Sequence, residues 1–171
     1  MSVNEELTKE EETYLYIIDQ CQKNSHFGKV LFNKILYFSD FDFYEGHEKS
    51  ITNGSYKRDT HGPVAIGFED IINKLKDKGY VGEKPIEATK GHVQIRYFIK
   101  KQFNRHLLSG AEIKELERNI MRLGGMTARQ VSEYSHQDMP YKATKDGEVI
   151  DYELVFYRNP IYSVNEHNKN L

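Results

Sequence analysis

The stretch that decides the fold of this chain is Phe32-Asn33-Lys34-Ile35-Leu36-Tyr37-Phe38-Ser39-Asp40-Phe41-Asp42-Phe43-Tyr44. At helical spacing its apolar side chains fall on three faces that together cover nearly the whole circumference. The faces are Leu31, Ile35 and Phe38, then Phe32, Leu36 and Phe43, and then Tyr37, Phe41 and Tyr44. A helix that is apolar nearly all round lies at the centre of its fold. We therefore predict a buried central helix over residues 27–44, with Ser25 as its N-cap and Gly46 as its C-terminal stop.

Capping signals followed by apolar stripes predict four further helices. Their starts are Thr8 with Glu11 in a capping box, Gly62-Pro63 with proline at the first helical position, Ser109 with Glu112 in a second capping box, and Thr127. The helix that begins at Gly62-Pro63 should end at Gly79, and the one capped by Thr127 should end near His136 before Pro140. These helices surround the central one in the predicted fold.

Two short stretches have the period of β-strands. Val93, Ile95, Tyr97 and Ile99 alternate with other side chains after a turn at Lys90-Gly91, which indicates a half-buried strand. Asp146-Gly147 is typical of a tight turn and predicts a small hairpin between Ala143 and Val149. The expected fold class is therefore α+β, a helix-dominated single domain of about five helices with a small antiparallel β element.

Composition excludes several classes of function. The chain has 171 residues, which suits one domain, and a formal net charge of −2, so no basic field exists to hold nucleic acid. A single cysteine, Cys21, excludes an intrachain disulfide and a cysteine-based zinc ribbon. No apolar run approaches the roughly 20 residues that span a bilayer, and the N-terminus lacks the features of a signal peptide. We expect a cytoplasmic protein without a membrane or nucleic-acid partner.

Asp40 is the first candidate functional residue, because it lies in the most hydrophobic helix of the chain. A carboxylate in such a place is costly unless it is paired or hydrogen-bonded. Helical spacing puts it on the same side as Tyr37 and Tyr44. Asp40 could accept hydrogen bonds in a binding site or act as a general base with a raised pKa. Alternatively, it caps a loop amide or pairs with Arg58 or a histidine.

His61 and His136 are the second pair of candidates, because each precedes a turn that contains proline. With Asp40 they could form a carboxylate–histidine pair for acid–base chemistry. Alternatively, His61 is only a loop residue, and His136 is a cation that interacts with the dipole at the C-terminal end of its helix. No His-x-x-x-His or His-x-His pair is present, and the phosphate-binding and nucleophile-elbow motifs are absent. We predict no metal and no cofactor.

The segment Thr127–Ser132 superficially resembles the first helix of a helix-turn-helix. In that interpretation the fourth and fifth helices would dock on DNA. The segment that follows contains Pro140 and is too broken to be a recognition helix, so a transcriptional regulator is kept only as an alternative.

The order of these motifs resembles that of the Panacea domain, the SocA-like antitoxin domain. Members carry a helix similar to Lys-Leu-Leu-Tyr-Phe-Ala-Asp, which corresponds here to Lys34–Asp40, with Ser39 where alanine is common. A glycine-containing turn, an extended segment ending in Gly-Pro and a helix follow, here Gly46–Thr52, Tyr56–Pro63 and Val64–Lys78. Near the C-terminus the family shows Ser-x-x-x-His and then Pro-Trp. Ser132 and His136 match this pattern, and Pro140-Tyr141 replaces the tryptophan by tyrosine.

The resemblance implies an antitoxin of bacterial and phage toxin–antitoxin pairs, which neutralises a partner toxin by direct protein–protein binding. The SocA branch resembles a proteolytic adaptor that delivers its toxin to a Clp protease. The implied organisation is an N-terminal helix in residues 1–26, a Panacea domain in 27–158 and a polar tail in 159–171, in which the residues from Asn165 to Leu171 are frayed.

We expect the partner to contact aromatic and polar groups at the motif loops, and we do not expect an enzyme. The candidate partner-binding residues are Tyr37, Asp40, Tyr56, His61, His136 and Tyr141. The alternative to a binding protein is a small hydrolase or transferase that uses Asp40 with His61 or His136. That alternative requires the three side chains to meet within hydrogen-bonding reach.

Overall fold

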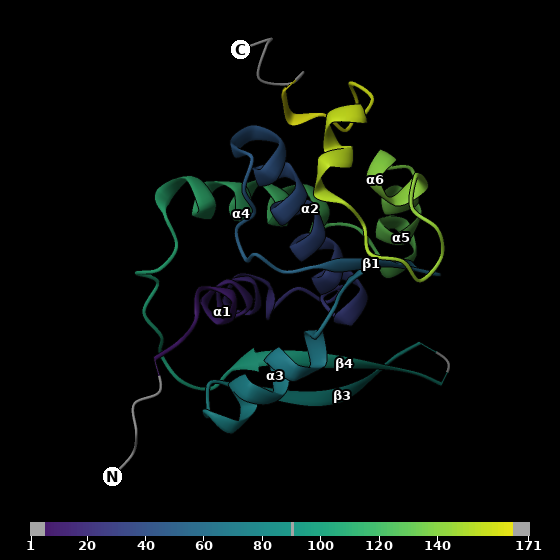
Figure 1. Cartoon of the computed structure of the whole chain (residues 1–171). Helices are drawn as coiled ribbons and strands as arrows, with labels where there is room; N and C mark the ends of the chain where they lie inside the picture. The colour runs from purple at the N-terminus through teal and green to yellow at the C-terminus, as the bar shows by residue number, and fades with distance from the viewer. Residues whose placement is uncertain (1–5, 90, 166–171) are drawn as a thin grey trace.

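The computed structural model describes residues 6–89 and 91–165, without the side chains of residues 88 and 89, and confirms a helix-dominated α+β domain (Figure 1). Six α-helices and one 3-10 helix occur in the described residues, with two antiparallel two-stranded sheets. In chain order the elements are α1 (Lys9–Cys21), α2 (Lys29–His47), β1 (Tyr56–Asp59), β2 (Gly62–Ala65), α3 (Phe68–Asp77), β3 (Val81–Thr89), β4 (His92–Ile99), α4 (Gly110–Leu123), α5 (Ala128–His136), α6 (Met139–Lys142) and the 3-10 helix η1 (Tyr152–Tyr157).

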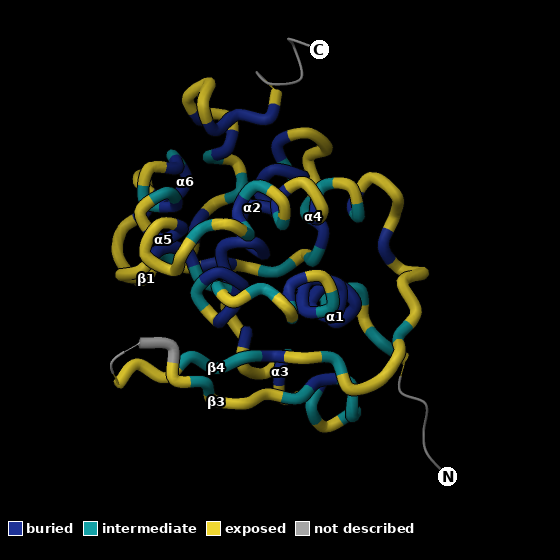
Figure 2. Tube along the Cα trace, turned by 180° about the vertical axis from the view of Figure 1, so that it is seen from behind, coloured by how far each residue is buried: buried dark blue, intermediate teal, exposed yellow. Residues whose placement is uncertain are grey.

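The central helix of the prediction is α2, and it is buried along most of its length (Figure 2). It contacts α4, α5, β2, β4 and η1, so the other elements are arranged around it. Phe32 is at the centre of an aromatic cluster with Tyr14, Phe27, Phe68 and Tyr97 at ring-centroid distances of 5.0–5.8 Å. This cluster joins α1, α2, α3 and β4 into one core.

The predicted capping signals are confirmed for three helices. Thr8 and Ser109 form capping boxes with Glu11 and Glu112, and Thr127 forms one with Gln130. The ends of α2 were predicted wrongly. Gly28 is its N-cap without a side-chain hydrogen bond, and the helix continues past Gly46 to His47. Glu48 ends it in the left-handed conformation, with φ of 56°.

The predicted helix start at Gly62-Pro63 is wrong, because these residues form strand β2. Gly62 has φ of 109°, a value that excludes a helical start, and Pro63 is paired with Arg58 of β1. Proline is tolerated here because it lies on the edge strand of a two-stranded sheet. Helix α3 begins six residues later at Phe68, after Gly67 with φ of 82°.

The predicted turn at Asp146-Gly147 is present, since the amide of Glu148 donates to the carbonyl of Lys145, but the predicted hairpin between Ala143 and Val149 is wrong. Val149 instead forms an isolated bridge with Lys57 of β1, and the amide of Gly147 donates to the carbonyl of Arg58. Residues 147–150 therefore pair with β1 along the edge that faces away from β2. A pairing across ninety residues leaves no local pattern in the sequence.

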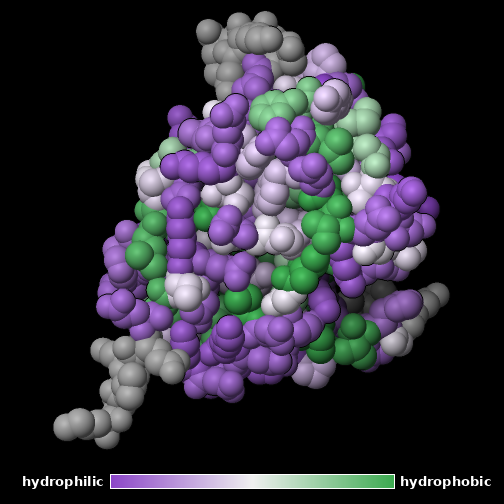
Figure 3. Space-filling model, viewed as in Figure 1, coloured by the Kyte–Doolittle hydropathy of each residue, from purple (hydrophilic) through white to green (hydrophobic). Residues whose placement is uncertain are grey.

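The β3–β4 hairpin confirms the predicted strand over residues 92–99, with Tyr97 buried and Val93 exposed at the far end, where the hairpin extends away from the helices (Figure 1). The face shown in Figure 3 is mostly hydrophilic, with hydrophobic side chains gathered in a band on its right side. None of the helices in the described ranges is long and apolar enough to cross a membrane.

Candidate functional site

Three residues of the central motif, Lys34, Tyr37 and Asp40, follow one another at three-residue spacing on α2. Such spacing places side chains on neighbouring positions of one helix side. All three are buried, with at most 1% of each residue exposed. Each reaches a different part of the chain, so the motif positions loops rather than presenting its own side chains to solvent.

Asp40 holds the loop between α2 and β1. Its carboxylate accepts hydrogen bonds from the amides of Ile51 and Thr52 at 2.8 and 2.9 Å, from the Thr52 hydroxyl at 2.5 Å and from the Tyr56 hydroxyl at 2.6 Å. Burial raises the pKa of the Asp40 carboxyl above its usual range, while these donors act in the opposite direction. Of the alternatives left open by the sequence, the structure favours the loop-capping carboxylate. Arg58 pairs instead with Asp146.

Tyr37 connects α2 to the junction between α5 and α6. Its hydroxyl donates to Asp138 Oδ2 at 2.7 Å, and Asp138 also receives two hydrogen bonds from Arg158, each at 2.9 Å. Arg158 donates in addition to Asp42 at 2.7 Å and Glu45 at 3.1 Å. This network was not predicted from the sequence. The only local signal was that two further acids, Asp42 and Glu45, lie on the same apolar helix as Asp40.

Lys34 lies below the tip of the β1–β2 hairpin. Burial lowers the pKa of its amine to about 8, and Asp59 opposes this shift. Gly62 packs against it so closely that a Cβ at this position would lie 2.7 Å from Lys34 Cε and 2.4 Å from Ser135 Oγ. The glycine of the motif is therefore required by close packing between α2 and α5, as well as by its positive φ.

Tyr141 joins the hairpin to α5 and α6. Its hydroxyl donates to the Asp59 carbonyl at 2.6 Å, and its ring lies 4.4 Å from the Arg58 guanidinium. The ring of His136 is stacked on Tyr141 at a centroid distance of 5.0 Å. Arg58 also donates to the carbonyls of Tyr141 and Thr144 at 3.1 and 2.9 Å, so it fixes the end of α6.

Two neighbouring hollows open where these elements meet, and His136 lines both. One, of about 530 Å³, is lined by Arg58, Thr60, His136, Tyr141, Lys142 and Asp146. The other, of about 430 Å³, is lined by Val30, His61, Ala128, Arg129, Ser132, Glu133 and His136. We call the residues that line the two hollows the hairpin–α5 surface.

The six predicted contact residues therefore divide into two groups. His61, His136 and Tyr141 line the hairpin–α5 surface, where His61 is exposed, His136 is half-buried and Tyr141 is buried with 4% exposed. Tyr37, Asp40 and Tyr56 lie beneath it in the core. Tyr37 holds the α5–α6 junction through Asp138, whereas Asp40 and Tyr56 hold the loop that precedes β1.

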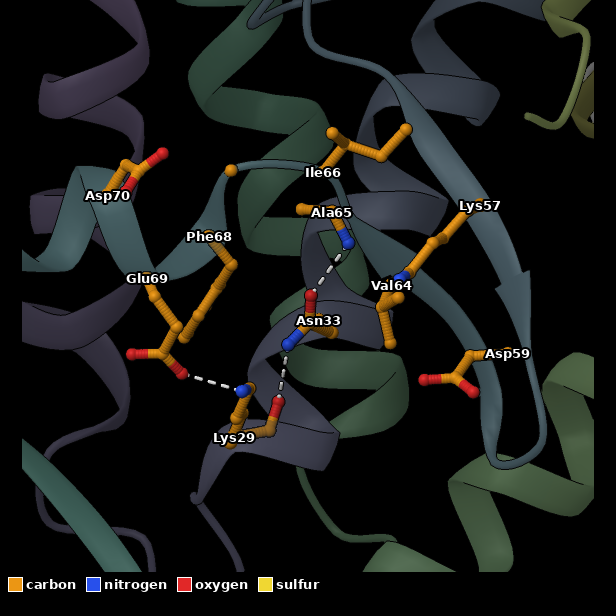
Figure 4. Close-up of a pocket in the computed structure, with 11 residues that line it drawn as sticks. Lys29, Asn33, Lys57, Asp59, Val64, Ala65, Ile66, Phe68, Glu69 and Asp70 are labelled. Atoms are coloured by element: carbon orange, nitrogen blue, oxygen red, sulfur yellow. Dashed lines mark hydrogen bonds and ion pairs between the residues drawn. The ribbon is translucent and has the colours of Figure 1, made fainter. Parts of the chain in front are cut away.

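A third hollow, of about 400 Å³, lies beside the outer edge of β2 (Figure 4). The amide of Ala65 donates to Asn33 Oδ1 at 2.8 Å, and Asn33 Nδ2 donates to the Lys29 carbonyl at 2.9 Å. Amides alternate in direction along a strand, and the other outward position of β2 is Pro63, which has no N–H. A partner strand therefore finds no free amide at this edge.

The geometry does not assemble the predicted acid–base group. The hydrogen bonds of Asp40 go to Ile51, Thr52 and Tyr56, and neither His61 nor His136 is among its partners in the described structure. In residues 6–89 and 91–165, no group of three or more histidine, cysteine or acidic side chains could hold a metal ion.

Comparison with protein families matches residues 32–142 to the family described as antitoxin SocA-like, Panacea domain. The chain belongs to this family. The matched part of the Panacea domain runs from α2 to α6 and contains Lys34, Tyr37 and Asp40. It also contains every residue of the hairpin–α5 surface except Val30 and Asp146. Comparisons with curated proteins and with solved structures gave no match.

Proposed function

We propose that this Panacea domain neutralises a partner toxin by binding it directly through the hairpin–α5 surface. Membership of the antitoxin family supports a toxin as the partner. The observation that carries the choice of surface is the position of His136. It lines both hollows, and the α5–α6 junction that follows it is held to the central helix by the hydrogen bond from Tyr37 to Asp138.

The chemistry of this surface suits a protein partner. It carries two arginines, Arg58 and Arg129, and two histidines at adjoining hollows, and arginine is among the residues that dominate the binding energy of protein interfaces. The hollows are open and rimmed by charged groups, including Arg129, Glu133 and Lys142. Neutralisation would then follow from occlusion of the toxin, or from its delivery to a Clp-type protease by the complex.

We propose a binding role and not catalysis, because the carboxylate best placed to act as a base is already engaged. Asp40 accepts four hydrogen bonds inside the core. A cytoplasmic setting, with neither membrane nor nucleic acid as the partner, completes the proposal. The net charge of −2 supports the absence of a nucleic-acid partner, because it provides no basic field for a phosphate backbone.

We also propose that the functional unit is larger than the matched segment. Helix α1 contributes Tyr14 to the core, and Arg158 and Tyr162 near the C-terminus hydrogen-bond to Asp138 and Tyr134. The predicted division into residues 1–26, 27–158 and 159–171 would then describe parts of one cooperative domain. Of the predicted tail, residues 166–171 lie outside the described residues.

The test is co-expression with the product of the adjacent gene, read as growth and as capture of a complex. The proposed function predicts that this product is toxic alone and harmless with the wild-type chain. His136→Ala combined with His61→Ala should weaken capture at least tenfold. Met121→Ala, an exposed position on α4, serves as the matched control and should leave capture unchanged. Equal capture by both variants would show that the partner binds elsewhere.

A further inference from the structure

The end of α2 and the η1 segment form a second surface, which we call the Tyr44 surface: Tyr44, Glu48, Asp151, Glu153 and Phe156. The Tyr44 hydroxyl donates to Glu153 Oε1 at 2.5 Å, and its ring centroid lies 6.2 Å from that of Phe156. Hydrogen bonding to Glu153 raises the pKa of Tyr44 to about 12, and the charges of Glu153, Glu48 and Asp151 add to the shift. Asp151 accepts a hydrogen bond from the Glu153 amide at 3.0 Å, and Glu48 is the residue that ends α2.

This surface exposes aromatic rings that the fold does not cover. Phe156 is 46% exposed, and the adjacent Tyr157 is 72% exposed. Residues three apart on a 3-10 helix are eclipsed, so Glu153 and Phe156 share one side of η1 and place a carboxylate beside a ring. Figure 3 shows hydrophobic side chains among hydrophilic ones over this part of the molecule.

The electrostatic character of the Tyr44 surface is negative. The Glu153 carboxylate accepts a hydrogen bond from the Tyr44 hydroxyl, and Glu48 and Asp151 add two further negative charges. The C-terminal end of the 19-residue helix α2 adds the partial negative charge of its carbonyls. Lys49 is the nearest cation along the chain from the end of α2, and the neighbouring His47 is stacked on Phe43 at 4.0 Å. The hairpin–α5 surface differs, because it carries Arg58, Arg129 and Lys142.

We propose that the Tyr44 surface binds an arginine-bearing segment of the partner toxin. A guanidinium is planar and can stack on an aromatic ring while its N–H groups pair with neighbouring carboxylates. Rings beside three carboxylates offer both interactions at once. A lysine ammonium is more strongly hydrated and lacks the planar fork, so arginine is the preferred cation. The identity of the partner as a toxin rests on the proposed function above.

The chemistry of this surface can be tested without the toxin. The probe is a fluorescein-labelled peptide of alternating arginine and glycine, and its lysine counterpart is the comparison. The wild-type chain should bind the arginine peptide at low salt and the lysine peptide at least threefold more weakly. Asp151→Asn combined with Glu153→Gln should weaken binding at least tenfold.

The matched control removes the same charge elsewhere, with Asp70→Asn and Glu87→Gln at exposed positions. It should change binding of the arginine peptide less than twofold. Equal losses in the two double variants would show a general charge effect and overturn the proposal. Absence of binding to the wild-type chain, or no preference for arginine, would overturn it as well.

A second experiment uses the toxin and separates this inference from the proposed function. Phe156→Ala combined with Glu153→Gln should weaken capture at least tenfold, whereas Met121→Ala should not. If the wild-type chain neutralises the toxin and the Phe156 variant binds equally well, the Tyr44 surface is not the contact, although the proposed function stands. If the wild-type chain neither neutralises nor binds the toxin, the proposed function fails, and the peptide experiment still decides the chemistry of the surface.

Discussion

Arg158 and Asp138 form a two-fold hydrogen-bonded ion pair in which both side chains are fully buried. Arg158 Nε and Nη2 each lie 2.9 Å from a different oxygen of Asp138. The pair links a residue beyond the matched family segment to one inside it. Because Arg158 also contacts Asp42 and Glu45, one guanidinium compensates charges from α2 and from the α5–α6 junction.

Replacing Arg158 by leucine should therefore be strongly destabilising. The substitution removes the cation that pairs with Asp138 and Glu45, whereas Asp42 keeps Arg118 and Arg122 as partners. Breaking a buried pair in this way costs about 3–5 kcal/mol. The free energy of unfolding, measured by chemical denaturation, should fall by that amount. Arg129→Leu removes an exposed pair with Glu133 and should change it by less than about 0.5 kcal/mol. Similar losses for both variants would contradict this account.

Asp40→Asn tests the loop-capping role. The amide keeps one acceptor oxygen but turns its NH₂ group toward donors, so at least one buried donor loses its partner. We expect a loss of about 1–3 kcal/mol in the free energy of unfolding. Hydrogen exchange at the amides of Ile51 and Thr52 should become faster. Asp70→Asn on the exposed start of α3 is the control and should leave both measurements unchanged.

Gly62→Ala tests the close packing between the hairpin, Lys34 and Ser135. Gly67→Ala is the matched control, because Gly67 also has a positive φ but nothing lies within 4 Å of its Cβ position. Backbone strain affects both variants, whereas overpacking affects only Gly62→Ala and costs about 1–3 kcal/mol. Thermal and denaturant unfolding should show this difference. Equal destabilisation would mean that the contact relaxes freely.

The buried amine of Lys34 predicts a pH dependence of stability. Its pKa in the folded protein is lowered to about 8, so the unfolded chain binds more protons than the folded one at pH values between about 8 and 10. The free energy of unfolding should therefore rise with pH in this window, by up to about 3 kcal/mol at 1.36 kcal/mol per pKa unit.

Lys34→Met keeps most of the side-chain volume without the titrating group. The free energy of unfolding of the wild-type chain minus that of this variant should increase as the pH rises from 8 to 10. Subtracting the two profiles cancels the contributions of the tyrosines, which titrate identically in both. A difference that stays constant with pH would place the pKa of Lys34 near its ordinary value.

The helices could be predicted where their signals are local. Thr8, Ser109 and Thr127 cap the helices that they were expected to cap, because a capping box needs only the next three residues. The candidate site was predicted in part. His61, His136 and Tyr141 line the two hollows, and the burial of Tyr37 and Asp40 agrees with the predicted central helix. Their distant hydrogen-bond partners, such as Asp138, could not be predicted from the sequence.

The sequence by itself determined a central apolar helix, the helices around it and the order of motifs that marks the Panacea family, because periodicity and capping act within a few residues. The tertiary structure alone decided that Gly62-Pro63 forms a strand, that Val149 pairs with Lys57 and that Arg158 lies in a buried network with Asp138 and Asp42. These contacts join residues far apart in the chain, and their energies depend on burial, which exists only once the whole domain has packed.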